Sequence, residues 1–324
     1  MSLLEVAGLT LDVPVFDGNG RILHGVDLTV EAGSAVGLVG ESGSGKSMTV
    51  RTIAALLPAG ATTSGKVLFA GEEVGGMSSS RLRRYRSSQV AMIFQDPRAA
   101  INPVRKVGDF LIENAVTNLG WSRAEARSKA IDVLREVGIV DPERRLDSFP
   151  SQLSGGLLQR AMIASTLLYE PELLLADEPT TALDVTTQSA VMALIDRLRR
   201  ERGMAMVFVS HDLELAAAVC DTINVMYAGR IVERLPAGEL HERSRHPYTR
   251  ALLDARPRLD GREARLRAIP GQPASGLEDI TGCAFAPRCP FALDLCRSSE
   301  PPLVVRDDGA VRCHRTDEIL WESQ

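Results

Sequence analysis

The stretch Gly40-Glu41-Ser42-Gly43-Ser44-Gly45-Lys46-Ser47 decides how the rest of the chain is interpreted. It follows the apolar run Ala35 to Val39, which predicts a short buried strand, and it leads into the segment Lys46 to Leu57, which predicts a helix. Glycines at such a junction let backbone N–H groups surround phosphate oxygens, and the positive end of the helix points at them. The sequence therefore predicts a phosphate-binding loop rather than a plain glycine-rich turn. In such a loop we expect Lys46 to neutralise the β and γ phosphates of ATP and the Ser47 hydroxyl to ligate Mg²⁺.

The composition argues against several classes of protein. The chain has 324 residues, 44% of them hydrophobic, and a net charge of −5, which argues against nucleic acid as the main partner. It contains no run of eighteen apolar residues that would indicate a membrane-spanning helix. Its opening, MSLLEVAGLT, lacks the charged and then apolar layout of a secretory signal. We therefore expect a soluble chain in the cytoplasm.

The pattern along the chain predicts an α/β fold with a mixed sheet core. Alternating apolar residues near the N-terminus predict an antiparallel β subdomain, and apolar residues at helical spacing from about Lys106 to Val140 predict an inserted helical subdomain, about 104–160. After it, strands alternate with helices, which predicts a parallel sheet covered on both faces. The expected domains are 1–242 and an extension, 243–324. The later elements are expected at 173–176, 204–209 and 223–227 (strands) and at 186–202 and 213–220 (helices).

A pair of carboxylates, Asp177 and Glu178, follows the apolar strand Leu173 to Ala176. This places them at the C-terminal edge of a parallel sheet, where such sheets bind ligands. Asp177 is expected to hold Mg²⁺ through water, and Glu178 to polarise the attacking water, because hydrolysis needs an oriented nucleophile in line with the γ-phosphate. The alternative is a solvated strand end.

The segment Leu153 to Arg160, with Ser154, Gly155 and Gly156, predicts either a second anion site at a helix start or a simple helix cap. Together with the phosphate-binding loop, Asp177-Glu178 and Ser210-His211-Asp212, it resembles the signature of ATP-binding-cassette (ABC) ATPases. The resemblance implies a P-loop NTPase fold. It also implies that Ser154, Gly155 and Gly156 complete the nucleotide site of a second subunit.

The resemblance assigns further roles. Gln95, in Ile93 to Pro97, looks like the glutamine that touches Mg²⁺ or water and senses membrane subunits, and His211 like the histidine that contacts the γ-phosphate. Asp184, in Ala182-Leu183-Asp184, matches the loop that faces the opposing subunit. The side chain that stacks on adenine is Phe16 or, with another strand register, Val13. One departure stands in the signature, where Leu157 replaces the common glutamine.

Three motifs resemble the ATPase subunits of dipeptide, oligopeptide and nickel importers: Gln95-Asp96-Pro97, Asn102-Pro103 and the run His246 to Leu253. This resemblance implies a translocase at the cytoplasmic face of the cell membrane, bound peripherally to two transmembrane permeases and served by an extracellular solute-binding protein. It also favours a heterodimer with a related ATPase. The alternatives are a nickel or other solute importer, a cassette ATPase acting on ribosomes or DNA, and a non-enzymatic regulator with a decayed cassette.

Four of the five cysteines crowd into the last stretch of the chain, which in a reducing cytosol suggests a metal before disulfides. Four thiolates can hold a [4Fe–4S] cluster or a tetrahedral zinc, and these spacings lack the close pairs of zinc fingers. The family resemblance favours iron–sulfur, and unligated structural thiols are the alternative. The fifth, Cys220, is interpreted as a buried helix residue. The expected ligands are Cys283, Cys289, Cys296 and Cys313.

Overall fold

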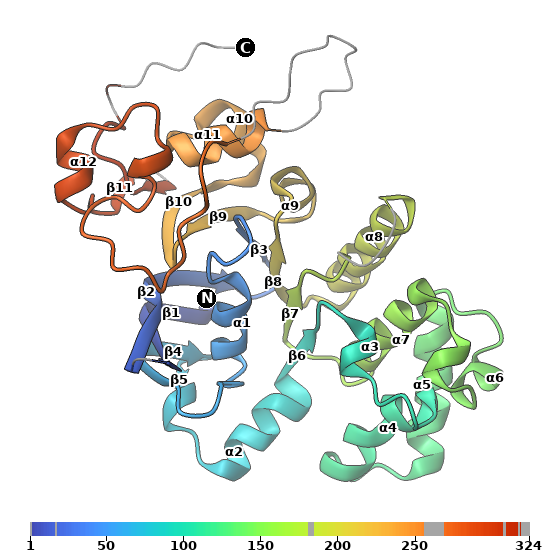
Figure 1. Ribbon diagram of the computed structural model, residues 1–324. Helices are drawn as coiled ribbons and strands as arrows, with labels where there is room; N and C mark the ends of the chain where they lie inside the picture. The colour runs from blue at the N-terminus through green and yellow to red at the C-terminus, as the bar shows by residue number, and fades with distance from the viewer. Residues whose placement is uncertain are drawn as a thin grey trace. The chain divides into compact units, whose positions relative to one another are not determined.

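The computed structural model describes residues 2–16, 18–180, 185–255, 269–306, 309–316 and 318 (Figure 1). The chain divides into two units that interleave along the sequence. One unit contains residues 1–3, 30–34 and 72–208, and the other contains 4–29, 35–71 and 209–324. The phosphate-binding loop belongs to the second unit, and the Asp177-Glu178 pair belongs to the first.

The N-terminal strands of the loop-bearing unit form a sheet in the order β2-β1-β4, where β1 is Ser2–Val15, β2 is Gly18–Glu31 and β4 is Thr62–Phe69. β1 runs antiparallel to β4. Buried and exposed residues alternate at the start of β1 because every second residue faces the core, as the buried Leu4 and Val6 show. The predicted strands at the start of the chain are confirmed.

In the same unit, strand β3 (Ala35–Val39) is buried along its whole length and runs parallel to β9 (Thr222–Tyr227). β9 continues through a tight turn into the antiparallel β10 (Arg230–Pro236). The tail then returns to this sheet, because β12 (Gly309–Val311) pairs with β10 and with β11 (Val304–Arg306). The sequence predicts β3 and β9 but not the three strands beyond them.

Helix α1 (Lys46–Ile53) is shorter than predicted, and the expected end at Leu57 is wrong. Ala55 takes a left-handed conformation with φ of 54°. The N–H of Leu56 then bonds back to the carbonyl of Arg51, and that of Ala55 to Thr52, which closes the last turn. The local apolar pattern continues past this turn, so periodicity alone could not place the end.

Helix α9 (Leu213–Val219) starts at the cap Asp212, whose carboxylate accepts the N–H of Leu215 at 2.9 Å. The interpretation of Cys220 as a helix residue needs correction. Cys220 is buried, but it follows the helix and has an extended backbone. The remaining elements of this unit are α10 (Leu240–Arg243), α11 (Pro247–Asp254), α12 (Asp294–Ser298) and the 3₁₀ turns Ala237–Glu239 and Ala286–Arg288.

The other unit contains the strands β6 (Val90–Ile93) and β7 (Leu173–Asp177) and most of β8 (Ala205–Ser210), in the order β8-β7-β6. β6 and β7 are parallel. Helix α8 (Val185–Arg202) connects β7 to β8, so the predicted strand and helix alternation is confirmed within a residue or two.

The predicted helical insertion is present in this unit as four helices (Figure 1). They bury the apolar residues that the helical spacing singles out, among them Leu111, Ala126 and Ala130. The helices are α4 (Val107–Asn118), α5 (Arg123–Glu136), α6 (Pro142–Leu146) and α7 (Gly155–Leu167). The shorter elements are β5 (Glu72–Glu73), α2 (Ser79–Arg84), α3 (Pro97–Ala100), the π-helix Tyr85–Gln89 and the 3₁₀ turns Val74–Gly76 and Pro150–Gln152.

Candidate nucleotide site

The predicted phosphate-binding loop lies between β3 and α1, as the sequence requires. Lys46 begins the helix and is only 4% exposed, and its ammonium donates to the carbonyls of Gly40 and Glu41 at 2.9 Å each. A Cβ at Gly40 would stand 2.1 Å from the carbonyl oxygen of Met226, so only glycine fits there. Gly45 has φ of 104°, which L side chains rarely adopt. The loop is therefore folded around its own lysine.

One buried polar atom in this loop supports a phosphate ligand. The hydroxyl of Ser44 is buried and has no hydrogen-bond partner among the described residues, whereas its carbonyl accepts the N–H of Gly229 at 2.9 Å. A buried hydroxyl needs a partner, and a phosphate oxygen accepts such a donor. The residues of the loop thus fit an ATP phosphate group.

The carboxylate pair stands at the end of β7 in the other unit. Asp177 is 1% exposed, while Glu178 is partly exposed and has a left-handed backbone with φ of 45°. β6 and β7 are parallel with Ile93 opposite Ala176, so the residues after both strands emerge at one edge of the sheet. This geometry brings Gln95 to Glu178, with an amide-to-carboxylate hydrogen bond of 3.2 Å. Two residues distant in sequence, both predicted to act in hydrolysis, are therefore neighbours.

The signature segment forms a capped helix start. The hydroxyl of Ser154 accepts the backbone N–H of Leu157 at 3.4 Å, and α7 begins at Gly155. Leu157 serves the cap through its backbone, so the exchange of glutamine for leucine leaves the cap intact. Gln159, which is 1% exposed, donates to the carbonyl of Pro179 at 2.6 Å. This bond fixes the signature helix to the residue directly after Glu178.

The other residues predicted for the nucleotide site are His211, the adenine-stacking candidates Phe16 and Val13, and Asp184. His211 is exposed directly after β8, in the unit that carries the phosphate-binding loop. Phe16 is fully exposed at the end of β1, whereas Val13 is half-buried. An exposed ring can stack on a base, but a half-buried valine offers less surface. Asp184 lies outside the described residues.

The four cysteines of the tail line one pocket together with His246 and His314. Desolvation raises the pKa of the Cys283 thiol to about 11, and it also raises the pKa of Cys289 and of Cys313. Within the described ranges, no three His, Cys, Asp or Glu side chains are arranged to hold a metal ion. Four thiols are the right number of donors for a metal or cluster that takes four thiolate ligands. Their sulfur atoms are not arranged around a common centre in this structure.

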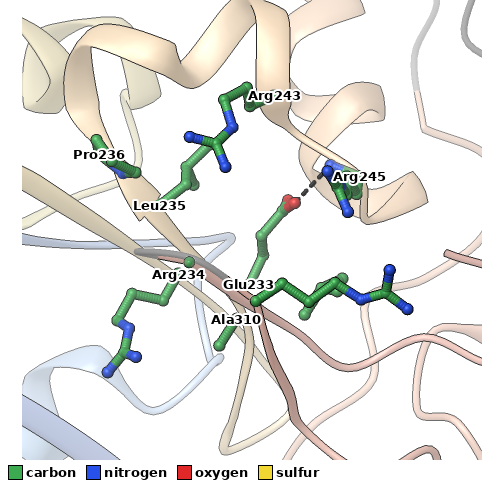
Figure 2. Close-up of a pocket in the computed structure, with 10 residues that line it drawn as sticks. Glu233, Arg234, Leu235, Pro236, Arg243, Arg245 and Ala310 are labelled. Atoms are coloured by element: carbon green, nitrogen blue, oxygen red, sulfur yellow. Dashed lines mark hydrogen bonds between the residues drawn. The ribbon is translucent and has the colours of Figure 1, made fainter. Parts of the chain in front are cut away.

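A second pocket runs along β10 and β12, and arginines and Glu233 line it (Figure 2). None of the residues predicted for the nucleotide site is among its described lining residues. Glu233 is 2% exposed, and desolvation raises its pKa to about 7. One oxygen of its carboxylate accepts the backbone N–H groups of Arg245 and His246. Sequence analysis did not single out Glu233. A signal was available, because this glutamate interrupts a run of apolar residues in a strand.

The buried strand, the glycine loop and the helix that starts at Lys46 define a P-loop nucleoside triphosphatase. Residues 23–181 match the family described as ABC transporter, and residues 232–296 match the family described as oligopeptide/dipeptide transporter, C-terminal region.

Curated relatives align over nearly the whole chain. A probable peptide ABC transporter ATP-binding protein of Sinorhizobium fredii is 47% identical, over 93% of this chain and 91% of the relative. The oligopeptide transport ATP-binding proteins OppD of Salmonella typhimurium and Escherichia coli are 41% and 40% identical, and each match covers 98% of this chain and 95% of the relative.

Two solved structures of ABC cassettes share the fold of this chain. A dimeric post-hydrolysis state of the ATP-binding cassette MJ0796, bound to ADP and Pi, matches with a TM-score of 0.64 and 26% identity, over 72% of this chain and 98% of that one. The cbiO1 protein of Clostridium perfringens, part of the ABC transporter complex cbiONQ, matches with a TM-score of 0.62 and 28% identity, over 74% of this chain and 90% of that one.

The chain belongs to the family of ATP-binding subunits of oligopeptide and dipeptide ABC transporters. The predicted family and the predicted P-loop NTPase fold are therefore confirmed, and the chain is an ABC-type ATPase that uses ATP and Mg²⁺. No helix in the described part of the chain is long and apolar enough to cross a bilayer.

Proposed function

We propose that this ATPase powers the import of peptides, working at the cytoplasmic face of the membrane as a peripheral subunit. The observation that carries the proposal is the combination of a match to the ABC transporter family with a match to the C-terminal region described for oligopeptide/dipeptide transporters. Relatives named as peptide or oligopeptide transport ATP-binding proteins support the peptide class of cargo. Import of nickel or another solute is the competing function.

In this proposal, the residues of the cassette divide into two tasks. Lys46 and the loop N–H groups bind the β and γ phosphates, and Phe16 stacks on the adenine. Glu178 orients the attacking water, with Gln95 holding the carboxylate in place at 3.2 Å. His211 contacts the γ-phosphate. Ser47, Asp177 and Gln95 would hold Mg²⁺, which neutralises charge that develops on the phosphates.

The proposed partners are two transmembrane permeases, an extracellular solute-binding protein and a second ABC ATPase. Ser154, Gly155 and Gly156 would complete the site of that second ATPase, with Asp184 facing it. We propose that the second cassette is a related chain, so that the working pair is a heterodimer. The dimeric state of MJ0796 supports pairing as such.

The test is purification of the chain from its own membranes in detergent, identification of the co-purifying subunits, and reconstitution into vesicles. The expected result is ATP-dependent uptake of a labelled oligopeptide that is lost with Glu178→Gln. Uptake of nickel without peptide would favour the competing function. Recovery without any membrane subunit would overturn the transport proposal. A single cassette species in the purified complex would overturn the heterodimer.

We propose further that Cys283, Cys289, Cys296 and Cys313 hold a [4Fe–4S] cluster. Their common pocket supports a shared ligand. Anaerobic purification, with iron, sulfide and zinc analysis and absorbance spectra, tests this. Four irons and four sulfides per chain are expected, and stoichiometric zinc without iron would contradict it.

A further inference from the structure

The second residue of the phosphate-binding loop, Glu41, is held by the cysteine-bearing tail. The guanidinium of Arg288 donates to both oxygens of the Glu41 carboxylate, at 2.6 and 3.0 Å. The two residues are 247 positions apart in sequence and lie in the same unit. The Arg288 side chain is 4% exposed and that of Glu41 is 25% exposed, so this is a largely buried, two-pronged ion pair rather than a surface contact.

Arg288 is fixed at its other end by the tail. Its Nε donates to the carbonyl of Pro270 at 2.9 Å, and its guanidinium lies 5.9 Å from the ring centres of Tyr227 and Phe285. It ends the 3₁₀ turn Ala286–Arg288, and the next residue is Cys289. The position of the Arg288 guanidinium therefore depends on the position of the backbone that carries the cysteines.

A second contact holds the backbone of the same residue. The N–H of Glu41 donates to the hydroxyl of Tyr248 at 2.8 Å. Tyr248 is wholly buried, and its ring packs 4.7 Å from that of Tyr227 and 5.3 Å from that of Phe285. Both the side chain and the amide of Glu41 are thus bound by residues that follow the cassette.

The negative charge of Glu41 bears on phosphate binding. The carbonyl of Glu41 accepts the ammonium of Lys46 at 2.9 Å, so Glu41 belongs to the loop that binds phosphate. An unpaired carboxylate at this position would repel the phosphates, and the positive charge of Arg288 offsets the charge of that carboxylate. We propose that Arg288 is a positioning residue, through which the tail sets the affinity of the phosphate-binding loop for ATP.

The inference rests on ATP binding by this loop, and a double-mutant cycle on the purified full chain tests it. Arg288→Gln is expected to raise the Kd for ATP about tenfold, because it leaves the Glu41 carboxylate unpaired beside the phosphates. Glu41→Gln combined with Arg288→Gln is expected to restore the Kd to within about threefold of wild type, because it removes that carboxylate. A purely structural role of Arg288 predicts no such rescue.

Arg297→Gln is the matched control, since Arg297 is an exposed arginine on α12 of the same tail. It should leave the Kd unchanged. Tyr248→Phe keeps the buried ring, removes only the acceptor for the Glu41 N–H, and is expected to raise the Kd about threefold. Thermal unfolding of each variant reports its folding. If Arg288→Gln does not fold, Arg288→Lys, which keeps the charge and loses the fork, and Tyr248→Phe decide instead.

An unchanged Kd in Arg288→Gln, or in both substitutes, would overturn the inference, as would a double variant no better than the single one. Failure of the wild-type chain to bind ATP would instead contradict the proposed function. The two failures are therefore distinguishable.

Discussion

The phosphate-binding loop and the carboxylate edge at Glu178 are held in different ways. The loop is fixed by Lys46 from inside, by glycines that no other residue could replace, and by Tyr248 and Arg288 from the tail. The carboxylate edge includes the 3.2 Å hydrogen bond that the amide of Gln95 donates to the carboxylate of Glu178. We call the loop the preorganised region, and we call the carboxylate edge, where Gln95 contacts Glu178, the adjustable region.

The largest expected effect falls on the adjustable side. Glu178→Gln removes the charge that orients the attacking water, while the phosphate contacts remain in the other unit. We expect a loss of ATP turnover of about 10⁴-fold with an unchanged Kd for ATP, and accumulation of an ATP-bound dimer. Steady-state hydrolysis, nucleotide titration and size-exclusion chromatography with ATP measure these quantities.

Glu170→Gln is the matched control, because Glu170 is an exposed glutamate in the same unit. It should hydrolyse ATP like wild type. Near-normal turnover in Glu178→Gln would refute the role assigned to Glu178 and would erase the distinction between the two regions.

On the preorganised side, Lys46→Ala should weaken binding itself. Lys46 is 4% exposed and its ammonium binds two loop carbonyls, so its loss removes both a positive charge for the phosphates and an internal support. We expect the Kd for ATP to rise about 10³-fold, or ~4 kcal/mol, in equilibrium titration. Lys66→Ala, at an exposed lysine of β4, is the control. An unchanged affinity in Lys46→Ala would count against the loop as described.

The same contrast explains what the sequence could predict. The strand before the loop, the helix start at Lys46 and the pair Asp177-Glu178 follow from local patterns of apolar residues, glycines and carboxylates. Arg288 and Tyr248 do not, since they lie 247 and 207 positions from Glu41 and no periodicity links them. One signal was available: a glutamate in the second position of a phosphate-binding loop requires a positive partner.

For the cysteines of the tail, the sequence predicts a shared site but does not identify its ligand. Their clustering in sequence predicts a shared site, and the four thiols do line one pocket. Their spacing cannot fix the ligand, because thiolates suit iron–sulfur and zinc alike and the choice depends on the volume and polarity of the folded pocket. The signature helix shows the same limit, because the bond from Gln159 to Pro179 depends on packing between segments that are distant in sequence.

Glu233, in the loop-bearing unit, adds a buried carboxylate that lines a pocket to the comparison (Figure 2). Its pKa is raised from 4.5 to about 7, so the protonated acid stabilises the fold fully below pH 4.5, and this contribution is lost as the pH rises through about 7. Arg250 is the charged group that opposes the shift most directly. Glutamine keeps an acceptor for the N–H groups of Arg245 and His246 and does not titrate.

We therefore expect Glu233→Gln to gain stability relative to wild type as the pH rises from 5 to 8, by about 3 kcal/mol at most. Urea unfolding at the two pH values measures the difference. Glu242→Gln, at an exposed glutamate of α10, should show no pH-dependent gain. A gain that is equal at pH 5 and pH 8 would show that Glu233 does not change its protonation on folding.

The smallest effect should come from Gln95, and it separates the two regions most finely. Gln95→Ala removes the 3.2 Å bond to Glu178 but no contact of the phosphate-binding loop, so kcat should fall about tenfold while the Kd for ATP stays within twofold. Gln95→Glu places a like charge beside Glu178 and should lower kcat further. If the Kd rises as much as kcat falls, Gln95 supports binding as well. The adjustable and the preorganised regions would then be one mechanical unit.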